Sequence, residues 1–303
     1  MEAFNELAKE LWGSFFQSSK IFDKVNDAWS NTNFDGKCSY IEKWDSTDTK
    51  EQYETNGNKK YTKDCITYYI NEWGYRIPTN EDLEDSRDII ACFGCSQTFG
   101  VGVKYEETWP FYLEQKLNKK YQTKNYGISG ASADMIARNI HNYLLDHTPK
   151  AICCLLPDMY RRELYDSTFA EYPRNYIRSH DETEKNIIKF CKDYDMNVLD
   201  FRAYKRLSEE DNSAYNFVKN VKFIEAVTKA SSVPVFLFTW DPYFLMMLYK
   251  GVFKSERFLT PTKQQYKTLE NWEKLDKARD NIHLGAGANG IFADLFFQQF
   301  ATL

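Results

Sequence analysis

Two short segments of the chain hold residue types that together perform nucleophilic chemistry. In Gly94-Cys95-Ser96, a serine follows a short apolar run and stands on a glycine-flanked turn. In Asp280-Asn281-Ile282-His283, a carboxylate precedes an imidazole by three residues, a spacing that places both on one face of a helical turn. Such an aspartate fixes the imidazole tautomer and stabilises the imidazolium that forms when a serine is deprotonated. The two segments predict a triad of Ser96, His283 and Asp280.

The other three histidines have simpler explanations. His141 and His147 lie on or at the end of a predicted helix, where His147 makes a favourable contact with the helix dipole. His180 stands in a charged segment, where a solvated side chain is expected. Only His283 has a carboxylate three residues before it, and we therefore take it as the candidate base.

The elements that must position these residues alternate along the second part of the chain. Buried-type strands are predicted at 89–93, before Tyr126, at 151–156 and at 233–239, and helices at 108–117, 135–145 and 214–230. This alternation predicts a three-layer α/β/α, doubly wound parallel sheet of the flavodoxin-like kind, with helices on both faces. Ligands of such sheets bind at the carboxyl ends of the strands, where Ser96 follows the first strand.

Residues 1–87 are predicted to form an N-terminal arm that packs on the core at 88–303. The arm has one or two amphipathic helices over 3–29, a surface loop over 31–63 and a strand at 65–70. Residues 160–208 carry many charges and aromatic side chains and are expected to form a cap-like insertion.

Three blocks of the chain resemble the SGNH or GDSL hydrolase family over residues 88–303. They are Gly94-Cys95-Ser96, the segment Asn125-x-Gly127-x-x-Gly130, and Asp280-x-x-His283, which stand in the family's order and spacing. The upstream segment Tyr68–Arg76 is also similar to one that precedes the serine block in some members. The resemblance implies esterase chemistry without a cofactor, with Ser96 as nucleophile, His283 as base and Asp280 as its orienter. It also implies an oxyanion hole made of the backbone N–H groups of Ser96 and Gly130.

Two positions depart from the family pattern. Cys95 replaces an aspartate, which we interpret as a structural difference. Asp158 stands where the family has an asparagine whose amide donates to the oxyanion, and an ionised carboxylate only accepts hydrogen bonds. Asp158 must then be protonated, turned away, or part of an altered site. Arg161 or Arg162 is either a cationic donor for an acidic substrate or part of a solvated cap surface.

Other candidate sites have competing explanations. Trp240 closes the last predicted strand and either lines the substrate pocket or packs against a helix. The Cys92-x-x-Cys95 spacing permits a thiol-redox site, although Cys92 is better explained as a buried strand residue. The Gly100-x-Gly102 and Gly285-x-Gly287 pairs lack the third glycine and the lysine of nucleotide loops, and no cluster has zinc-ligand spacing. No cofactor and no metal are expected.

Charge and cysteine content limit the partners and the compartment. The 39 basic and 44 acidic residues give a net charge of -5. The chain thus has no excess of basic residues of the kind that binds the phosphates of a nucleic acid. Seven scattered cysteines suit a reducing compartment, and neither a signal peptide nor a membrane span is recognisable. A cytoplasmic or virion-associated protein is expected, and its oligomeric state is left open.

The resulting hypothesis is a serine hydrolase that cleaves carboxylic esters through an acyl-enzyme. The expected substrate is an O-acetyl or short-acyl ester of a carbohydrate or lipid. The alternative is a hydrolase scaffold weakened by Asp158, which acts as a carbohydrate-binding or assembly protein.

Overall fold

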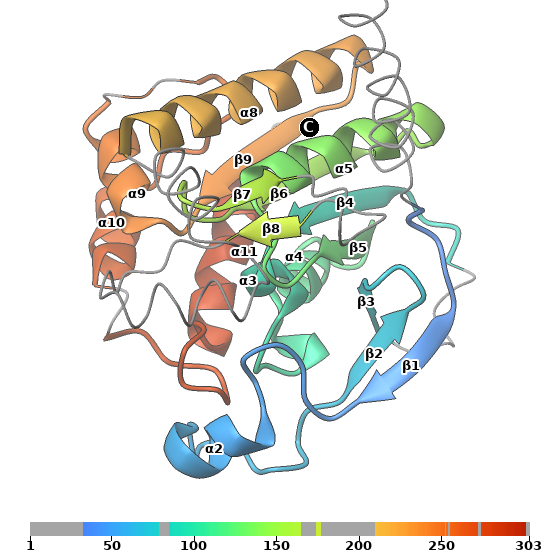
Figure 1. The fold of residues 1–303 in the computed structure, drawn as a ribbon. Coiled ribbons are helices and arrows are strands. Elements are labelled where there is room, and N and C mark those ends of the chain that lie inside the picture. Colours follow the sequence, from blue (N-terminus) through green and yellow to red (C-terminus); the bar gives the residue numbers. More distant parts are fainter. Residues whose placement is uncertain are drawn as a thin grey trace, which may run out of the picture.

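The structure is a computed structural model that describes residues 33–78, 85–164, 174–176, 210–251, 253, 255–271 and 274–300. The helices expected over 3–29 and most of the cap-like insertion, including His180, lie outside the described residues. The described part holds a central parallel sheet, helices that cover it and most of the arm (Figure 1).

In the described residues, the central sheet has four parallel strands in the order β5-β4-β6-β9. They are β4 (Ile89–Gly94), β5 (Gln122–Gly127), β6 (Ala151–Leu156) and β9 (Val235–Thr239). All six residues of β6 are buried, as expected for a strand with helices on both of its faces. An isolated bridge from Leu237 to Phe258 extends the pairing beyond β9.

Helices cover both faces of this sheet, so the expected three-layer α/β architecture is confirmed. On one face, α5 (Ala133–Asp146) and α8 (Glu210–Ala230) pack on each other and share a buried apolar cluster with the strands. On the other face, α4 (Trp109–Lys116) and α11 (Ala286–Phe300) contribute to a second cluster, in which the rings of Trp109 and Phe296 stack at 4.7 Å. Figure 1 shows the sheet between the two pairs of helices.

The strand order fixes where a ligand site forms. After β4 the chain continues to β5 on one side and later returns to β6 on the other side of β4. The direction of winding therefore reverses between β4 and β6, and the crevice at the carboxyl ends of these strands is the preferred binding place in such sheets. Ser96 follows β4 and Asp158 follows β6, so both stand at this crevice.

The arm is more structured than its sequence indicated. The expected loop over 31–63 contains β1 (Cys38–Glu42) and α2 (Lys50–Asn56), and the next strand, β2, spans Tyr68–Asn71 rather than starting at Cys65. Because α2 buries none of its residues, it has no apolar periodicity to reveal it. Its start is stabilised by Thr49, whose hydroxyl accepts a hydrogen bond from the Gln52 N–H at 3.1 Å.

The strands β1, β2 and β3 (Arg76–Ile77) form a small antiparallel sheet next to the edge strand β5. Figure 1 shows this sheet and α2 on the side of the core where α3 (Ser96–Phe99) lies. Tyr68 and Ile70 of β2 join a buried cluster with Phe99, Val101 and Val103. The arm therefore packs directly against the segment that follows Ser96.

The remaining described elements are short. A 3₁₀ helix η2 (Tyr105–Glu107) precedes α4, and α9 (Pro242–Tyr249) and α10 (Lys263–Glu270) follow β9. The insertion begins with β7 (Arg162–Leu164), which pairs with β8 (Arg174–Tyr176). Buried Arg138 on α5 holds Glu163 of β7 at 2.8 Å. In the described ranges, every helix is too short or too polar to cross a bilayer.

Candidate active site

Ser96 is the first residue of α3, directly beyond the carboxyl end of β4. Its side chain is almost fully buried, with 2% of the residue exposed. Among the described residues, its hydroxyl has one polar contact, the Cys95 sulfur at 3.9 Å. The serine thus stands where the fold places ligands, with a hydroxyl that no strong hydrogen bond engages.

Asp280 and His283 are joined by a short hydrogen bond. Nδ1 of His283 lies 2.6 Å from Oδ2 of Asp280, and the backbone N–H groups of Ile282 and His283 both donate to Oδ1 at 3.0 Å. Asn281 has a φ of 59°, so the segment is a tight turn closed by the aspartate side chain and not the helical turn expected from the spacing. The side chains meet because the carboxylate bonds to backbone groups two and three residues further on.

The environment of Asp280 keeps it ionised. Burial by itself raises the pKa of this carboxyl, but the hydrogen bond from His283, the charge of that ring and the Thr47 hydroxyl together lower the pKa below its usual value. An ionised Asp280 accepts a hydrogen bond from Nδ1–H, so in the neutral form of the His283 ring Nε2 is the nitrogen without a proton. This is the tautomer that a general base requires.

The Asp280–His283 turn is anchored to the segment that follows Ser96. The Arg279 N–H donates to the Gly102 carbonyl at 2.7 Å, and a Cβ on Gly102 would lie 2.8 Å from Ala278 Cβ. The Ser96 hydroxyl itself makes no hydrogen bond with His283 among the described residues. Such bonds are often long before a substrate binds and tighten in the reacting complex.

In the Asn125–Gly130 block, Asn125 makes structural hydrogen bonds, whereas Gly130 lies beside open space. The Asn125 side chain donates to the Thr98 carbonyl at 2.7 Å and accepts from the Gly127 N–H at 3.0 Å, which ties β5 to α3. Gly130 has a φ of 78°, and no atom would come within 4 Å of a Cβ there. Its backbone is therefore in a conformation that favours glycine, next to open space.

Asp158 and Arg161 form an ion pair at the carboxyl end of β6. Arg161 Nε donates to Asp158 Oδ2 at 2.6 Å, and Oδ1 accepts from the Tyr160 N–H at 3.2 Å. Both carboxylate oxygens are thus directed into their own loop, and the negative charge is neutralised. The sequence left open whether Asp158 is protonated, turned away from the oxyanion position or part of an altered site. The hydrogen bonds within its own loop favour the second possibility.

Arg161 is mostly buried rather than solvated, so the explanation as a solvated cap surface is wrong for this arginine. The Arg161 side chain is 11% exposed, and its Nη1 is buried without a hydrogen-bond partner in the described part of the chain. Burial disfavours the charged guanidinium, but the nearby Cys95 and Asp158 side chains outweigh burial and raise the pKa of Arg161. Arg162 is also half-buried and bonds the Asn212 carbonyl at 2.7 Å.

Trp240 follows β9, the strand next to β6. The Arg161 guanidinium lies 5.6 Å from the centre of its ring, and the indole N–H is buried without a partner in the described ranges. Asp241, the next residue, accepts from the Met159 N–H at 3.2 Å and so fixes the loop after β6. Trp240 and Arg161 therefore meet beside the crevice where Ser96 stands.

Several supporting residues come from the arm, where sequence reasoning assigned none. The Thr47 hydroxyl donates to Asp280 Oδ2 at 2.6 Å, and the Gln52 side chain donates to the Asp280 carbonyl at 2.9 Å. Asp48 and Arg279 form an ion pair at 2.6 Å in which both side chains are fully buried. These contacts join positions more than 220 residues apart, and local sequence patterns carry no signal for them.

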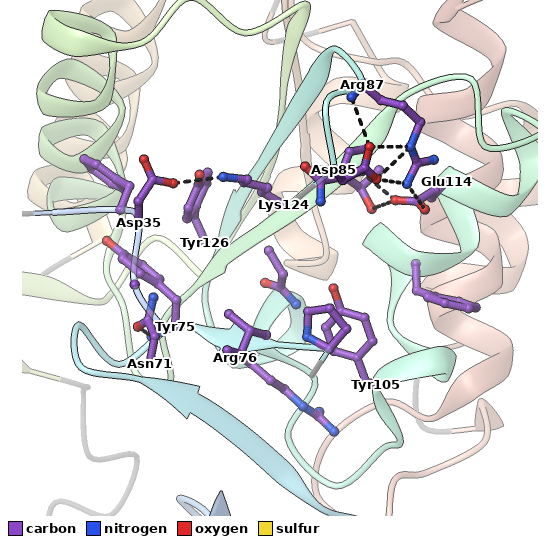
Figure 2. A pocket seen from close by; sticks show the side chains of 18 of the residues that line it. Asp35, Asn71, Tyr75, Arg76, Asp85, Arg87, Tyr105, Glu114, Lys124 and Tyr126 are labelled. Carbon is purple, nitrogen blue, oxygen red and sulfur yellow. Dashed lines mark hydrogen bonds and ion pairs between the residues drawn. The ribbon is translucent and has the colours of Figure 1, made fainter. Parts of the chain in front are cut away.

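A separate cavity of about 320 Å³ lies between the arm, α4 and β5, and Figure 2 shows its lining. Five of its charged side chains pair with one another: Lys124 with Asp35 at 2.8 Å, and Arg87 with Asp85 and Glu114. None of the predicted site residues lines it.

The described thiols and acidic groups offer no redox or metal centre. The free thiols include Cys92 and Cys95. Burial raises the pKa of the Cys92 thiol well above its usual value, which disfavours a reactive thiolate. No group of three or more histidine, cysteine or acidic side chains is placed to hold a metal ion in the described ranges.

Comparison with known proteins finds similarity among solved structures. No protein-family model and no curated protein sequence matches the chain. AlinE4, an SGNH-hydrolase family esterase, is 14% identical, with 51% of this chain and 59% of AlinE4 covered and a TM-score of 0.30. TesA is 12% identical, with 71% and 98% covered and a TM-score of 0.39.

A carbohydrate acetylesterase family member from Sinorhizobium meliloti is 14% identical, with 71% of this chain and 98% of that chain covered and a TM-score of 0.35. The matched structures thus include SGNH-family esterases, the family that the motifs of this chain resemble.

Proposed function

We propose that this protein is a serine esterase that hydrolyses carboxylic esters through an acyl-enzyme. Ser96 is the nucleophile, His283 the general base and Asp280 the residue that orients it. The observation that carries the proposal is the 2.6 Å bond between His283 Nδ1 and the buried, ionised Asp280, because it leaves Nε2 free to accept a proton. The turn that holds this pair is anchored to the segment that follows Ser96.

The reaction proceeds in two balanced stages. Ser96 Oγ attacks the ester carbonyl carbon while its proton moves to His283 Nε2, and the carbonyl π electrons move onto the oxygen. The intermediate collapses as the bond to the alcohol oxygen breaks, and that oxygen takes the proton from His283. A water molecule then attacks the acyl-serine in the same way, which releases the carboxylic acid and restores Ser96.

The negative oxygen of the intermediate needs donors, and three are proposed. Two are the backbone N–H groups of Ser96 and Gly130, and the side of Gly130 where a Cβ would stand is open among the described residues. The third is Arg161 Nη1, a buried donor without a partner in the described ranges. Leaving such a donor unpaired costs about 1–3 kcal/mol, and a partner that arrives with the substrate would recover that cost.

The Asp158–Arg161 pair supplies an N–H donor without a net negative charge, as the side-chain amide of an asparagine would at this position. The pair is neutral as a whole, and its carboxylate oxygens are occupied by Arg161 Nε and the Tyr160 N–H. It still offers an N–H donor, which the guanidinium charge strengthens. The replacement of asparagine by Asp158 is therefore compatible with an active site.

The substrate class to test first is an O-acetyl or short-acyl ester of a carbohydrate or lipid. Trp240 supports this choice, because it combines an apolar ring next to Arg161 with a buried N–H that has no partner among the described residues. Trp240 and Arg161 are the proposed substrate-binding side chains, and the reaction needs no cofactor.

A fluorophosphonate probe tests the nucleophile directly. Labelling of the native chain is expected, with loss of labelling and of p-nitrophenyl acetate turnover in Ser96→Ala and His283→Ala. Ser231→Ala and His141→Ala are matched controls. The side chains that they remove contact the Val227 carbonyl and Asn142, which are not part of the proposed site. Labelling that survives in Ser96→Ala, or a folded native chain that neither reacts nor turns over any acyl ester, refutes the proposal.

Chemical rescue tests the role of Arg161. Arg161→Ala is expected to lower kcat about 100-fold or more with little change in KM, as loss of an oxyanion donor does. Added guanidinium ion should restore part of the rate in Arg161→Ala and none in Ser96→Ala. A loss confined to substrates that carry a carboxylate would instead make Arg161 an anion-binding residue and remove it from the oxyanion hole.

A further inference from the structure

Residues 44–58 of the arm hold the turn that carries Asp280 and His283 at several points. The Asn58 side chain donates to the Lys277 carbonyl at 2.6 Å, and the Asn58 N–H donates to the Arg279 carbonyl at 2.8 Å. The Gln52 side chain donates to the Asp280 carbonyl at 2.9 Å. The backbone of this turn is therefore bonded to the arm on both sides of Arg279.

Thr47 adds a contact to the carboxylate itself. Its hydroxyl lies 2.6 Å from Asp280 Oδ2 and 3.3 Å from His283 Nδ1. Oδ2 can only accept, so it receives both the Nδ1 proton at 2.6 Å and the hydroxyl proton. The longer contact between Thr47 and His283 then joins two donors that share one acceptor.

The alternative direction of the Thr47 hydroxyl would be unfavourable for a base. If the hydroxyl donated to Nδ1, the ring proton would reside on Nε2, which could then not accept the serine proton. Because Asp280 is ionised, the hydroxyl proton is drawn to its carboxylate instead. The geometry of Oδ2 thus selects the reactive tautomer with two donors, one of them from the arm.

We propose that Thr47 is a positioning residue of the active site, which fixes the Asp280 carboxylate and through it the tautomer and orientation of His283. This inference rests on the proposed esterase function, and it makes the arm a part of the site. Thr47 is an exposed residue, whereas Asp280 is fully buried, so substitution at Thr47 changes this hydrogen bond and leaves the apolar core intact.

Three substitutions at Thr47 separate the hydroxyl from the bulk of the side chain. Thr47→Val keeps the shape and is expected to lower kcat about fivefold to tenfold with KM unchanged, because it removes one charge-assisted bond to a carboxylate. Thr47→Ser should restore the native rate. Thr47→Ala should fall between the two, because a water molecule can enter and donate to Asp280 in place of the hydroxyl.

Thr67→Val is the matched control. Thr67 belongs to the same arm, and its hydroxyl accepts from the Lys43 side chain at 3.0 Å on the surface. Its replacement should leave kcat and KM unchanged. An equal loss in Thr47→Val and Thr67→Val would mean general damage to the arm and would overturn the inference.

A spectroscopic measurement keeps the inference separate from the proposed reaction. The low-field proton resonance of His283 Nδ1–H, assigned by its absence in His283→Ala, should shift in Thr47→Val and return in Thr47→Ser. This signal does not depend on turnover, so it tests Thr47 even if Ser96→Ala shows that the chain is no esterase. An unchanged resonance together with an unchanged kcat in Thr47→Val overturns the positioning role.

Discussion

The buried ion pair between Asp48 and Arg279 is expected to hold the arm on the core. Both side chains are 0% exposed, and Arg279 Nε and Nη2 donate to the Asp48 carboxylate at 2.9 and 2.6 Å. Asp48 also accepts from the Tyr68 hydroxyl at 2.6 Å. Asp48→Ala would leave the Arg279 charge buried without its counterion, a change that costs about 3–5 kcal/mol in proteins.

The remaining contacts of Arg279 place the expected loss at the lower end of that range. Without Asp48, the guanidinium keeps the Lys63 carbonyl at 2.8 Å, the Lys43 carbonyl at 2.5 Å and the Trp44 ring at 4.0 Å. We therefore expect the free energy of unfolding to fall by about 3 kcal/mol in Asp48→Ala. Urea unfolding monitored by tryptophan fluorescence measures this as a lower midpoint with an unchanged slope.

A double variant and a surface control test the reasoning. Asp48→Ala combined with Arg279→Met should be less destabilised than Asp48→Ala alone, because removal of both partners leaves no uncompensated buried charge. Glu54→Ala breaks the exposed pairs with Lys50 at 4.0 Å and Lys63 at 3.6 Å and should cost less than about 0.5 kcal/mol. A loss below about 1 kcal/mol in Asp48→Ala, or additive losses in the double variant, would refute the counterion argument.

Three further outcomes follow from the geometry. The lowered pKa of Asp280 means that its stabilising contribution is present above the unfolded value of about 3.9 and is lost as pH falls through the folded value. Urea titrations at falling pH should therefore show a steeper loss in the native chain than in Asp280→Asn, and parallel curves would contradict this. Cys92 and Cys95 are fully buried, so both should resist a thiol reagent until the chain unfolds, and rapid labelling of the native state would count against their burial. Gly127→Ala places a Cβ 2.3 Å from the Phe99 backbone nitrogen and should destabilise the chain by about 1–3 kcal/mol in urea, whereas native stability would show that the strand can shift.

The sequence predicted the central sheet because its strands are recognisable locally. The runs at 89–93 and 151–156 are continuously apolar, and the structure has β4 at Ile89–Gly94 and β6 at Ala151–Leu156. A strand covered on both faces has such a composition whatever its neighbours are. The helix expected at 108–117 likewise appears as α4, with Thr108 before it and Pro110 in its first turn.

The arm was harder to predict because its elements depend on distant partners. The segment over 31–63 is polar and aperiodic, yet it contains β1, α2 and the buried Asp48. Burial of a charged residue requires a counterion, and Arg279 lies 231 positions further along the chain. A pattern read within one window cannot contain such a partner.

In the candidate site, too, some features could be predicted from the sequence and others depend on distant contacts. The sequence by itself determined which residues have the chemistry, because Ser96, Asp280 and His283 stand in short motifs whose residue types limit what they can do. Only the tertiary structure decided that Asp158 is neutralised by Arg161 and that Thr47 reaches Asp280 from the arm. Residue type sets the proton and charge capacity of a group, whereas its orientation and its counterions are set by whatever the fold packs against it.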